Sequence, residues 1–194
     1  DSAWAASDAP EGQPHARLLD AARREGRPIE LAEARALGLA LSSALFTAHQ
    51  LGDDLLAAHG ALTPWCVHVR KLSARDCDLA VGDFGLLPHL LLPSATHEAA
   101  RLWLPVAPEL AGSERRPTPA ADVFAAAMIL AETLSLTPAR ATLFAAITGD
   151  PRTLGAAIER LRPGLHASVR DALVAAFQRD PGRRPPNANR FARL

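Results

Sequence analysis

Apolar residues recur along much of this chain at the three- and four-residue spacing of amphipathic helices. Residues 15–26, HARLLDAARREG, carry a short pattern of this kind that ends at Gly26. In the longer segment that follows, apolar residues one helical turn apart form a stripe, and Gly52 provides a C-terminal stop. The stripe consists of Leu37, Leu41, Leu45 and Ala48. A single stripe of this length predicts a helix that packs against a partner helix.

A third helix is predicted in TPAADVFAAAMILAETLSL, with Thr118 as its N-cap and Pro119 at its first helical position. No charged residue occurs between Asp122 and Glu132. A helix that is apolar on every side is surrounded by protein, so this segment is expected to be the central helix of the domain. Two more helical patterns follow, in PRTLGAAIERL and in HASVRDALVAAFQRD, and the second ends at the breaker DPG.

One stretch differs from its helical neighbours. In WCVHVRKLSARDCDLAV, β-branched residues stand on either side of a polar SARD turn. This predicts a hairpin in which residues 66–72, from Cys66 to Leu72, pair with residues 77–81, from Cys77 to Val81. Residues 1–14 are small, polar and proline-bearing and are expected to be a tail or linker. The predicted fold is therefore a mainly helical domain over residues 15–194 with one small hairpin.

Composition limits the functions that such a domain can have. The chain has 194 residues, 48% of them hydrophobic, which suits one domain with a single core. Lys and Arg together number 21, as do Asp and Glu, so there is no basic field to attract nucleic acid. The sequence shows no uninterrupted apolar run of the roughly 18 residues that span a bilayer. The two cysteines are interpreted as reduced packing residues, which indicates a cytoplasmic protein.

Three short motifs follow one another in a fixed order. His59, with Leu62 at the matching offset, is followed by Asp83-Phe84-Gly85 and then by Ala107-Pro108-Glu109. Protein kinases carry H-R-D-L-x-x-x-N, D-F-G and A-P-E in this order. The chain thus resembles the C-terminal lobe of the protein kinase family, especially that of bacterial serine/threonine kinases. The resemblance runs from about residue 15 to residue 194, nearly the whole chain.

Two later features extend the resemblance. Family members have an Asp at the start of a buried central helix, here Asp122, and a late DPxxRP, here DPGRRP with Arg184. The resemblance implies structural roles for these residues. Glu109 is expected to pair with Arg184, Asp122 to hold the backbone around His59, and Phe84 to pack beneath the neighbouring loop. No GxGxxG string occurs in the chain, and the tail is too short for the five strands and helix of an N-terminal lobe, so that lobe is expected to be absent.

The residues that carry chemistry in the family are replaced here. The position of the catalytic Asp is Ala61, that of the phosphate-stabilising Lys is Thr63, and that of the metal-binding Asn is Cys66. A neutral thiol is a poor ligand for Mg²⁺. Asp83 is the one survivor of the metal and phosphate machinery, and we interpret it as vestigial. The resemblance therefore implies a pseudokinase with no catalytic residue, cofactor or metal.

Other candidate sites have simpler interpretations. His59 as a catalytic base would need a nucleophile motif nearby, so a packed and hydrogen-bonded histidine is favoured. Cys66, His68 and Cys77 would approach one another across the hairpin, but a fourth zinc ligand is not obvious. Arg183 in GRRPP would reach a phosphate or simply be solvated.

With catalysis and nucleic-acid binding disfavoured, the sequence predicts that the domain acts by binding another protein. Residues 86–106 are leucine-rich and must be buried against their own lobe or against another protein. Trp65, Leu92 and Trp103 are the candidate interface residues, because large apolar side chains anchor interfaces. We expect an adaptor whose protein partner covers either the surface where the N-terminal lobe would sit, around His59, Trp65 and Phe84, or the loop of residues 86–106. The alternatives are a nucleotide-sensing regulator or phosphotransferase completed by an N-terminal lobe from elsewhere, and a regulatory domain within a larger protein.

Overall fold

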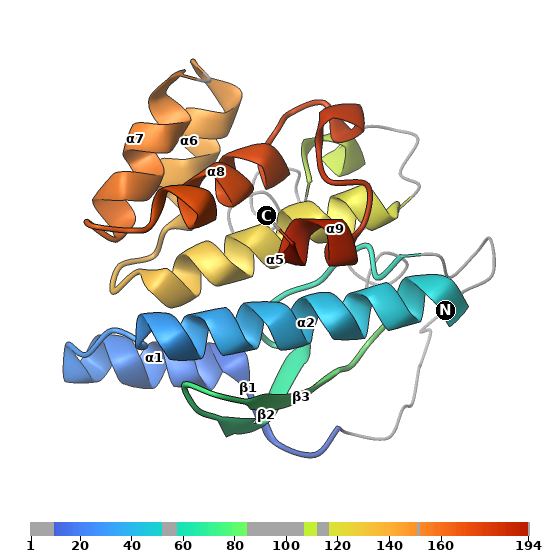
Figure 1. The fold of residues 1–194 in the computed structure, drawn as a ribbon, viewed down its shortest axis with the longest axis vertical. Helices are drawn as coiled ribbons and strands as arrows, with labels where there is room; N and C mark the ends of the chain where they lie inside the picture. Colours follow the sequence, from blue (N-terminus) through green and yellow to red (C-terminus); the bar gives the residue numbers. More distant parts are fainter. Residues whose placement is uncertain (1–9, 52–57, 85–106, 112–116, 151, 194) are drawn as a thin grey trace, which may run out of the picture.

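The computed structural model describes residues 10–51, 58–84, 107–111, 117–150 and 152–193. These residues form a mainly helical domain with a small antiparallel sheet (Figure 1). In chain order, the elements are β1 (Gln13–Pro14), α1 (His15–Glu25), α2 (Leu31–Leu51), β2 (Val67–Leu72), β3 (Cys77–Val81), η1 (Pro108–Ala111), α5 (Pro119–Leu134), α6 (Arg140–Thr148), α7 (Arg152–Leu161), α8 (Ala167–Ala176), η2 (Pro181–Arg183) and α9 (Ala188–Ala192).

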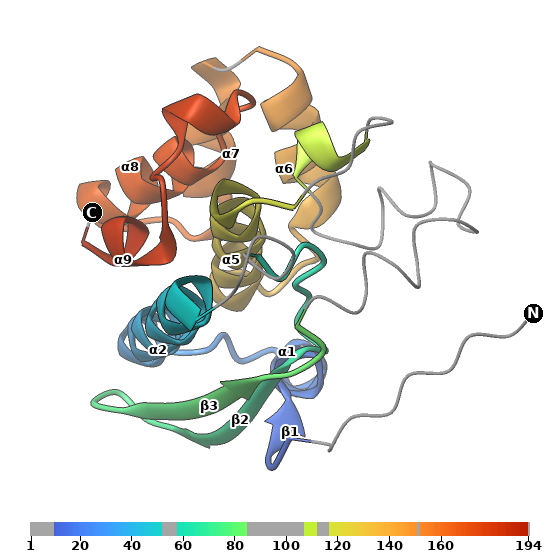
Figure 2. The ribbon, with the colours of Figure 1, turned by 90° about the vertical axis from the view of Figure 1, so that its right-hand side faces the viewer.

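The elements are arranged in layers around α5. Figure 2 shows the sheet at one end, then α1 and α2, then α5 with α9 beside it, and α6 to α8 beyond α5. Helix α2 packs against β3, α5 and α9, and α5 also contacts α8. Residues 59 and 60, which precede β2, lie beside the start of α5.

Helix α5 is the central helix that the sequence predicts. The Thr118 hydroxyl accepts a hydrogen bond from the backbone N–H of Ala121 at 3.3 Å, and Pro119 follows it as the first helical residue. Almost every residue of α5 is buried. Phe124 meets Phe177 edge to face, with ring centroids 5.4 Å apart, and so joins α5 to the end of α8.

Helix α2 has the predicted leucine stripe. Leu37, Leu41 and Leu45 are buried in one cluster with Val67 of β2 and Ile129 of α5. By length and composition α2 would also suffice to cross a membrane, and it is the one helix of the described residues that would. The sequence predicts no such helix by unbroken apolar runs, because polar residues interrupt the apolar ones in α2. Its buried stripe is what a core helix of a globular domain requires.

The predicted hairpin is present with one strand added. Strands β2 and β3 pair antiparallel, with Val67 opposite Val81 and Leu72 opposite Cys77. Strand β1 adds to the other edge of β2 and lies within the segment expected to be a tail. Gly12 precedes it at φ 106°, and a Cβ there would lie 2.8 Å from the carbonyl oxygen of Val69. The close approach of the two backbones therefore requires glycine.

Helix α1 ends as predicted, with Gly26 in the left-handed conformation that closes many helices. Helices α6 and α9 were not predicted. Helix α6 begins with Arg140, which donates two hydrogen bonds to the carboxylate of Glu132, at 2.6 and 3.0 Å. Glu132 is buried near the end of α5, so this charge pair fixes the turn from α5 into α6.

Candidate functional site

The site begins with the buried carboxylate of Asp122 in the first turn of α5. One of its oxygens, Oδ2, accepts the backbone N–H of His59 at 2.6 Å and lies 2.9 Å from Nε2 of His49. The other, Oδ1, accepts the backbone N–H of Gly60 at 2.9 Å. Asp122 therefore holds the backbone at residues 59–60, as the resemblance implied, and links it to α2 through His49.

His59 is packed and hydrogen-bonded, the interpretation that the sequence favoured. Its side chain is buried, and Nε2 lies 3.0 Å from the carbonyl oxygen of Gly82. The ring of Phe84 meets it edge to face at 5.3 Å. Burial lowers the pKa of His59, against the opposing influence of Asp122. A neutral ring that donates to Gly82 joins the segment after β3 to the loop before β2.

The three positions that would carry phosphoryl transfer lie together and are buried. Ala61 is 5% exposed, Thr63 6% and Cys66 1%. The Thr63 hydroxyl lies 3.2 Å from Sγ of Cys66, and that thiol donates weakly to the carbonyl oxygen of Ala61 at 3.9 Å. Burial raises the pKa of Cys66, so the thiol stays protonated near neutral pH. These side chains satisfy one another and include neither a base nor an anionic ligand.

Asp83 is exposed and has a φ of 57°, which is unusual for a residue other than glycine. Magnesium in phosphoryl-transfer sites is held by carboxylates or amides together with phosphate oxygens and waters. Of the positions that would hold it, Asp83 offers a carboxylate and Cys66 offers only a buried neutral thiol. The described residues at these positions therefore do not supply the ligands of a Mg²⁺–ATP site.

Glu109 and Arg184 form the ion pair that the resemblance implied. Nη1 and Nη2 of Arg184 donate to the two carboxylate oxygens of Glu109, each at 2.7 Å. The guanidinium also donates to backbone carbonyls of Gln178, Arg179 and Ala120, and it lies 5.0 Å from the centroid of the Phe124 ring. Such a fully bonded buried arginine ties η1 to α5 and to the segment that follows α8.

Trp65 is the candidate interface residue that the structure describes. It is 56% exposed although its neighbours in the loop are buried. The loop itself is held in place, because the backbone N–H of Ala16 in α1 donates to the carbonyl oxygen of Pro64 at 3.1 Å. Leu92 and Trp103, with the whole loop of residues 86–106, lie outside the described residues.

The remaining candidates are the possible zinc ligands Cys66, His68 and Cys77 and the possible phosphate-binding residue Arg183. Within the described part of the chain, no group of three or more His, Cys, Asp or Glu side chains is arranged to hold a metal ion. Cys66 and Cys77 are free thiols, and partial burial raises the pKa of Cys77 to about 11. Arg183 is largely exposed, with Nε 3.7 Å from a carboxylate oxygen of Asp180.

Two buried histidines were not singled out from the sequence. His49 continues the four-residue spacing of Leu37, Leu41 and Leu45. A polar residue on an otherwise apolar helix face indicates a buried polar partner, and in the structure that partner is Asp122. His15 lies 2.8 Å through Nε2 from the Thr133 hydroxyl, which donates to the carbonyl oxygen of Ile129. Burial and, to a smaller extent, Arg23 lower the pKa of His15 to about 4.

Comparisons with known proteins add no family to these observations. No model of a known protein family matches the chain, and no curated protein matches it.

Proposed function

We propose that this chain is a catalytically inactive, kinase-like domain, a pseudokinase built on a C-terminal lobe, that acts as a protein-interaction scaffold or adaptor. The observation that carries the proposal is the contrast within one loop. The framework contacts made by Asp122 are complete, whereas the three positions that would carry catalysis, Ala61, Thr63 and Cys66, are buried and lack ionised groups.

The second framework pair supports the same proposal. Arg184 and Glu109 make a bidentate ion pair between segments 75 residues apart in the sequence, and Arg184 donates to three backbone carbonyls as well. These contacts stabilise a fold and contribute nothing to chemistry. A chain that makes such framework contacts without catalytic groups is suited to present a surface.

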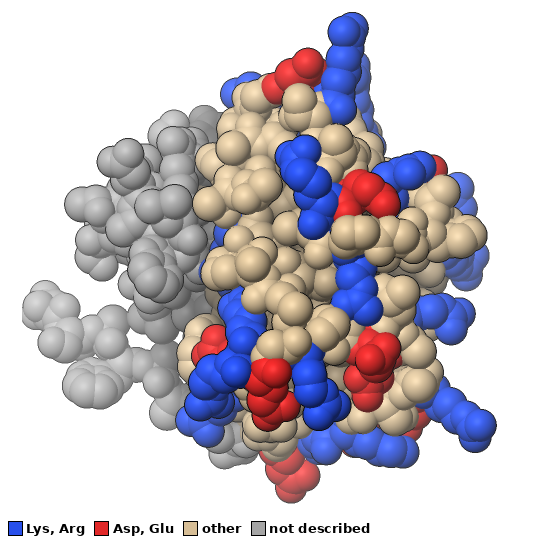
Figure 3. Space-filling view, turned by 90° about the vertical axis from the view of Figure 1, so that its left-hand side faces the viewer, with Lys and Arg blue, Asp and Glu red and all other residues tan. Residues whose placement is uncertain are grey.

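A protein partner is the proposed ligand of that surface. Trp65 is a large exposed aromatic side chain on a loop fixed by hydrogen bonds, so it would bind with little loss of loop entropy. Positive side chains cover more of the face drawn in Figure 3 than negative ones, which lie among them, and over the whole chain 21 Lys and Arg balance 21 Asp and Glu. The two free cysteines suit the cytoplasm, which we propose as its location.

The test is recovery of the full-length chain with its partner from cells, by reversible cross-linking and mass spectrometry. Trp65→Glu is expected to abolish recovery of one specific partner, whereas Asp83→Ala leaves it unchanged. Leu51→Glu is the matched control, because Leu51 is an apolar side chain with 82% exposure at the end of α2. Loss of the partner in Asp83→Ala, with the fold intact, would refute the scaffold function.

The alternative is a nucleotide-sensing regulator or phosphotransferase completed by an N-terminal lobe from another chain or from upstream sequence. The exposed carboxylate of Asp83 is the observation in its favour, since it is free to meet a cation brought by another subunit. This function requires Mg²⁺–ATP to bind in a manner that depends on Asp83.

A further inference from the structure

A cavity of about 490 Å³ opens between residues of α2, α5, α8 and α9. Figure 2 shows these four helices side by side, with α2 nearest the sheet. We call it the α2–α8 cavity. Its walls are mostly aliphatic, and six of the residues that form them are Leu31, Leu39, Leu130, Leu134, Leu165 and Val169.

The floor of the α2–α8 cavity has room because of a glycine. Gly38 and Leu130 both line the cavity, and a Cβ at Gly38 would already be in van der Waals contact with Leu130, 3.4 Å from its Cδ1. A larger side chain at this position would therefore fill the floor. One turn further along α2, Ser42 also lines the cavity and is 1% exposed.

The charges at the α2–α8 cavity have one sign. Arg35 and Arg193 are the ionised side chains that line it, and no Asp or Glu is among its described lining residues. Both arginines are exposed, and their guanidinium groups have no ion pair or hydrogen bond with the described residues. Helix α8 also begins at the cavity and has no acidic residue in its first turn. The electrostatics favour an anion there.

The volume of the cavity, about 490 Å³, lies in the usual range of small-molecule sites.

We propose that the α2–α8 cavity binds an aliphatic carboxylate of the fatty-acid class, with the hydrocarbon chain along the leucine walls and the carboxylate at Arg35 and Arg193. Apolar walls and a cationic rim match the two parts of such a molecule. The site is separate from the loop around His59 and is independent of the scaffold function.

Calorimetric titration of the full chain with monomeric dodecanoate tests the proposal. We expect one molecule to bind per chain, and dodecyltrimethylammonium, with the same tail and the opposite charge, to bind at least tenfold more weakly. Gly38→Leu should abolish binding while retaining the fold by circular dichroism, since leucine favours helix over glycine. Arg35→Glu combined with Arg193→Glu should weaken binding at least tenfold.

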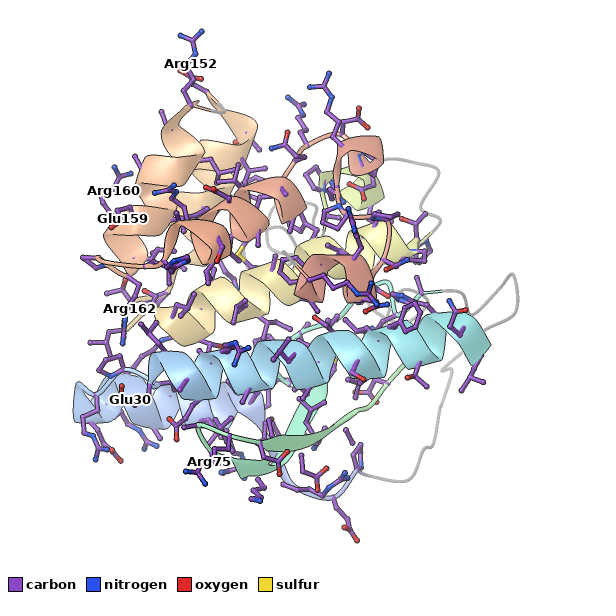
Figure 4. The ribbon with its side chains drawn as sticks, viewed as in Figure 1. Glu30, Arg75, Arg152, Glu159, Arg160 and Arg162 are labelled. Carbon is purple, nitrogen blue, oxygen red and sulfur yellow. The ribbon has the colours of Figure 1, made fainter. Side chains whose placement is uncertain are left out.

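Arg152→Glu is the matched control, because Arg152 is an exposed arginine at the far end of α7 (Figure 4). It should leave the affinity unchanged. Undetectable dodecanoate binding, equal affinity for the cationic amphiphile, or binding that survives Gly38→Leu would overturn the proposal. A concentration-dependent dimer in sedimentation, abolished by Gly38→Leu, would also overturn it and assign the cavity to a second copy of the chain.

Discussion

Replacing Asp122 with Asn should destabilise the domain strongly, although the two side chains have nearly the same shape. The carboxylate accepts the backbone N–H groups of His59 and Gly60 and also meets Nε2 of His49, all within 2.9 Å. An asparagine keeps one acceptor oxygen and turns an NH₂ group toward the donors that met the other oxygen. At least one charge-assisted hydrogen bond is lost and a buried donor is left without an acceptor.

The expected cost follows from those losses. A hydrogen bond to a charged group contributes about 1.5–3 kcal/mol, and an unpaired buried donor costs about 1–3 kcal/mol. Because contributions within one network are not additive, we expect a loss of about 3 kcal/mol in the free energy of unfolding. For a chain of 194 residues this lowers the melting temperature by roughly 6–12 °C.

The assay is urea and thermal unfolding followed by circular dichroism. Asp78→Asn is the control, because Asp78 is an exposed carboxylate that pairs with Arg70 on the hairpin, and its melting temperature should match the wild type. A loss below about 1 kcal/mol for Asp122→Asn would refute the reasoning that this carboxylate holds the loop.

Three further predictions concern other parts of the framework. The folded pKa of His15, about 4, lies below the ordinary 6.5, so the unfolded chain binds the extra proton. The free energy of unfolding, measured by urea titration, should therefore be highest above pH 6.5 and fall by up to about 3 kcal/mol toward pH 4. An unfolding free energy that stays constant or rises as the pH falls would contradict this. Glu109→Ala should cost about 3 kcal/mol by urea unfolding, because it leaves the buried Arg184 without its counter-charge, and a change near zero would exclude a structural role for the pair. Thr118→Ala should lower unfolding stability by about 1 kcal/mol through loss of the N-cap, while a fall in melting temperature no larger than that of Asp78→Asn would show that the cap contributes little.

The sequence predicted those elements whose patterns arise within one segment. The leucine stripe of α2, the uncharged run of α5 and the Thr118–Pro119 cap are local signals, and each corresponds to the helix that forms. The hairpin was also local, with its turn residues between two β-branched stretches. Strand β1 could not be found in this way, because two residues carry no periodicity and Gln13–Pro14 forms a strand only through its pairing with β2.

The candidate site was predicted less evenly. The positions of Asp122, Glu109 and Arg184 followed from the order of motifs, and their contacts are present, but no local pattern would have paired residues so far apart. His49 was missed because its role depends on the approach of α2 to the start of α5. The α2–α8 cavity could not be predicted either, because it forms only when helices from four parts of the chain come together.

The melting temperature with and without millimolar Mg²⁺–ATP, for the wild type and for Asp83→Ala, tests the scaffold function most directly. A ligand at 100 times its dissociation constant adds about 2.7 kcal/mol, which for this chain is a shift of several degrees. The proposed pseudokinase would show no shift in either protein, because Cys66 and Thr63, at the positions where the resembled kinases hold metal and phosphate, are buried and uncharged. A shift in the wild type that disappears in Asp83→Ala would contradict this proposal and establish a nucleotide-binding domain.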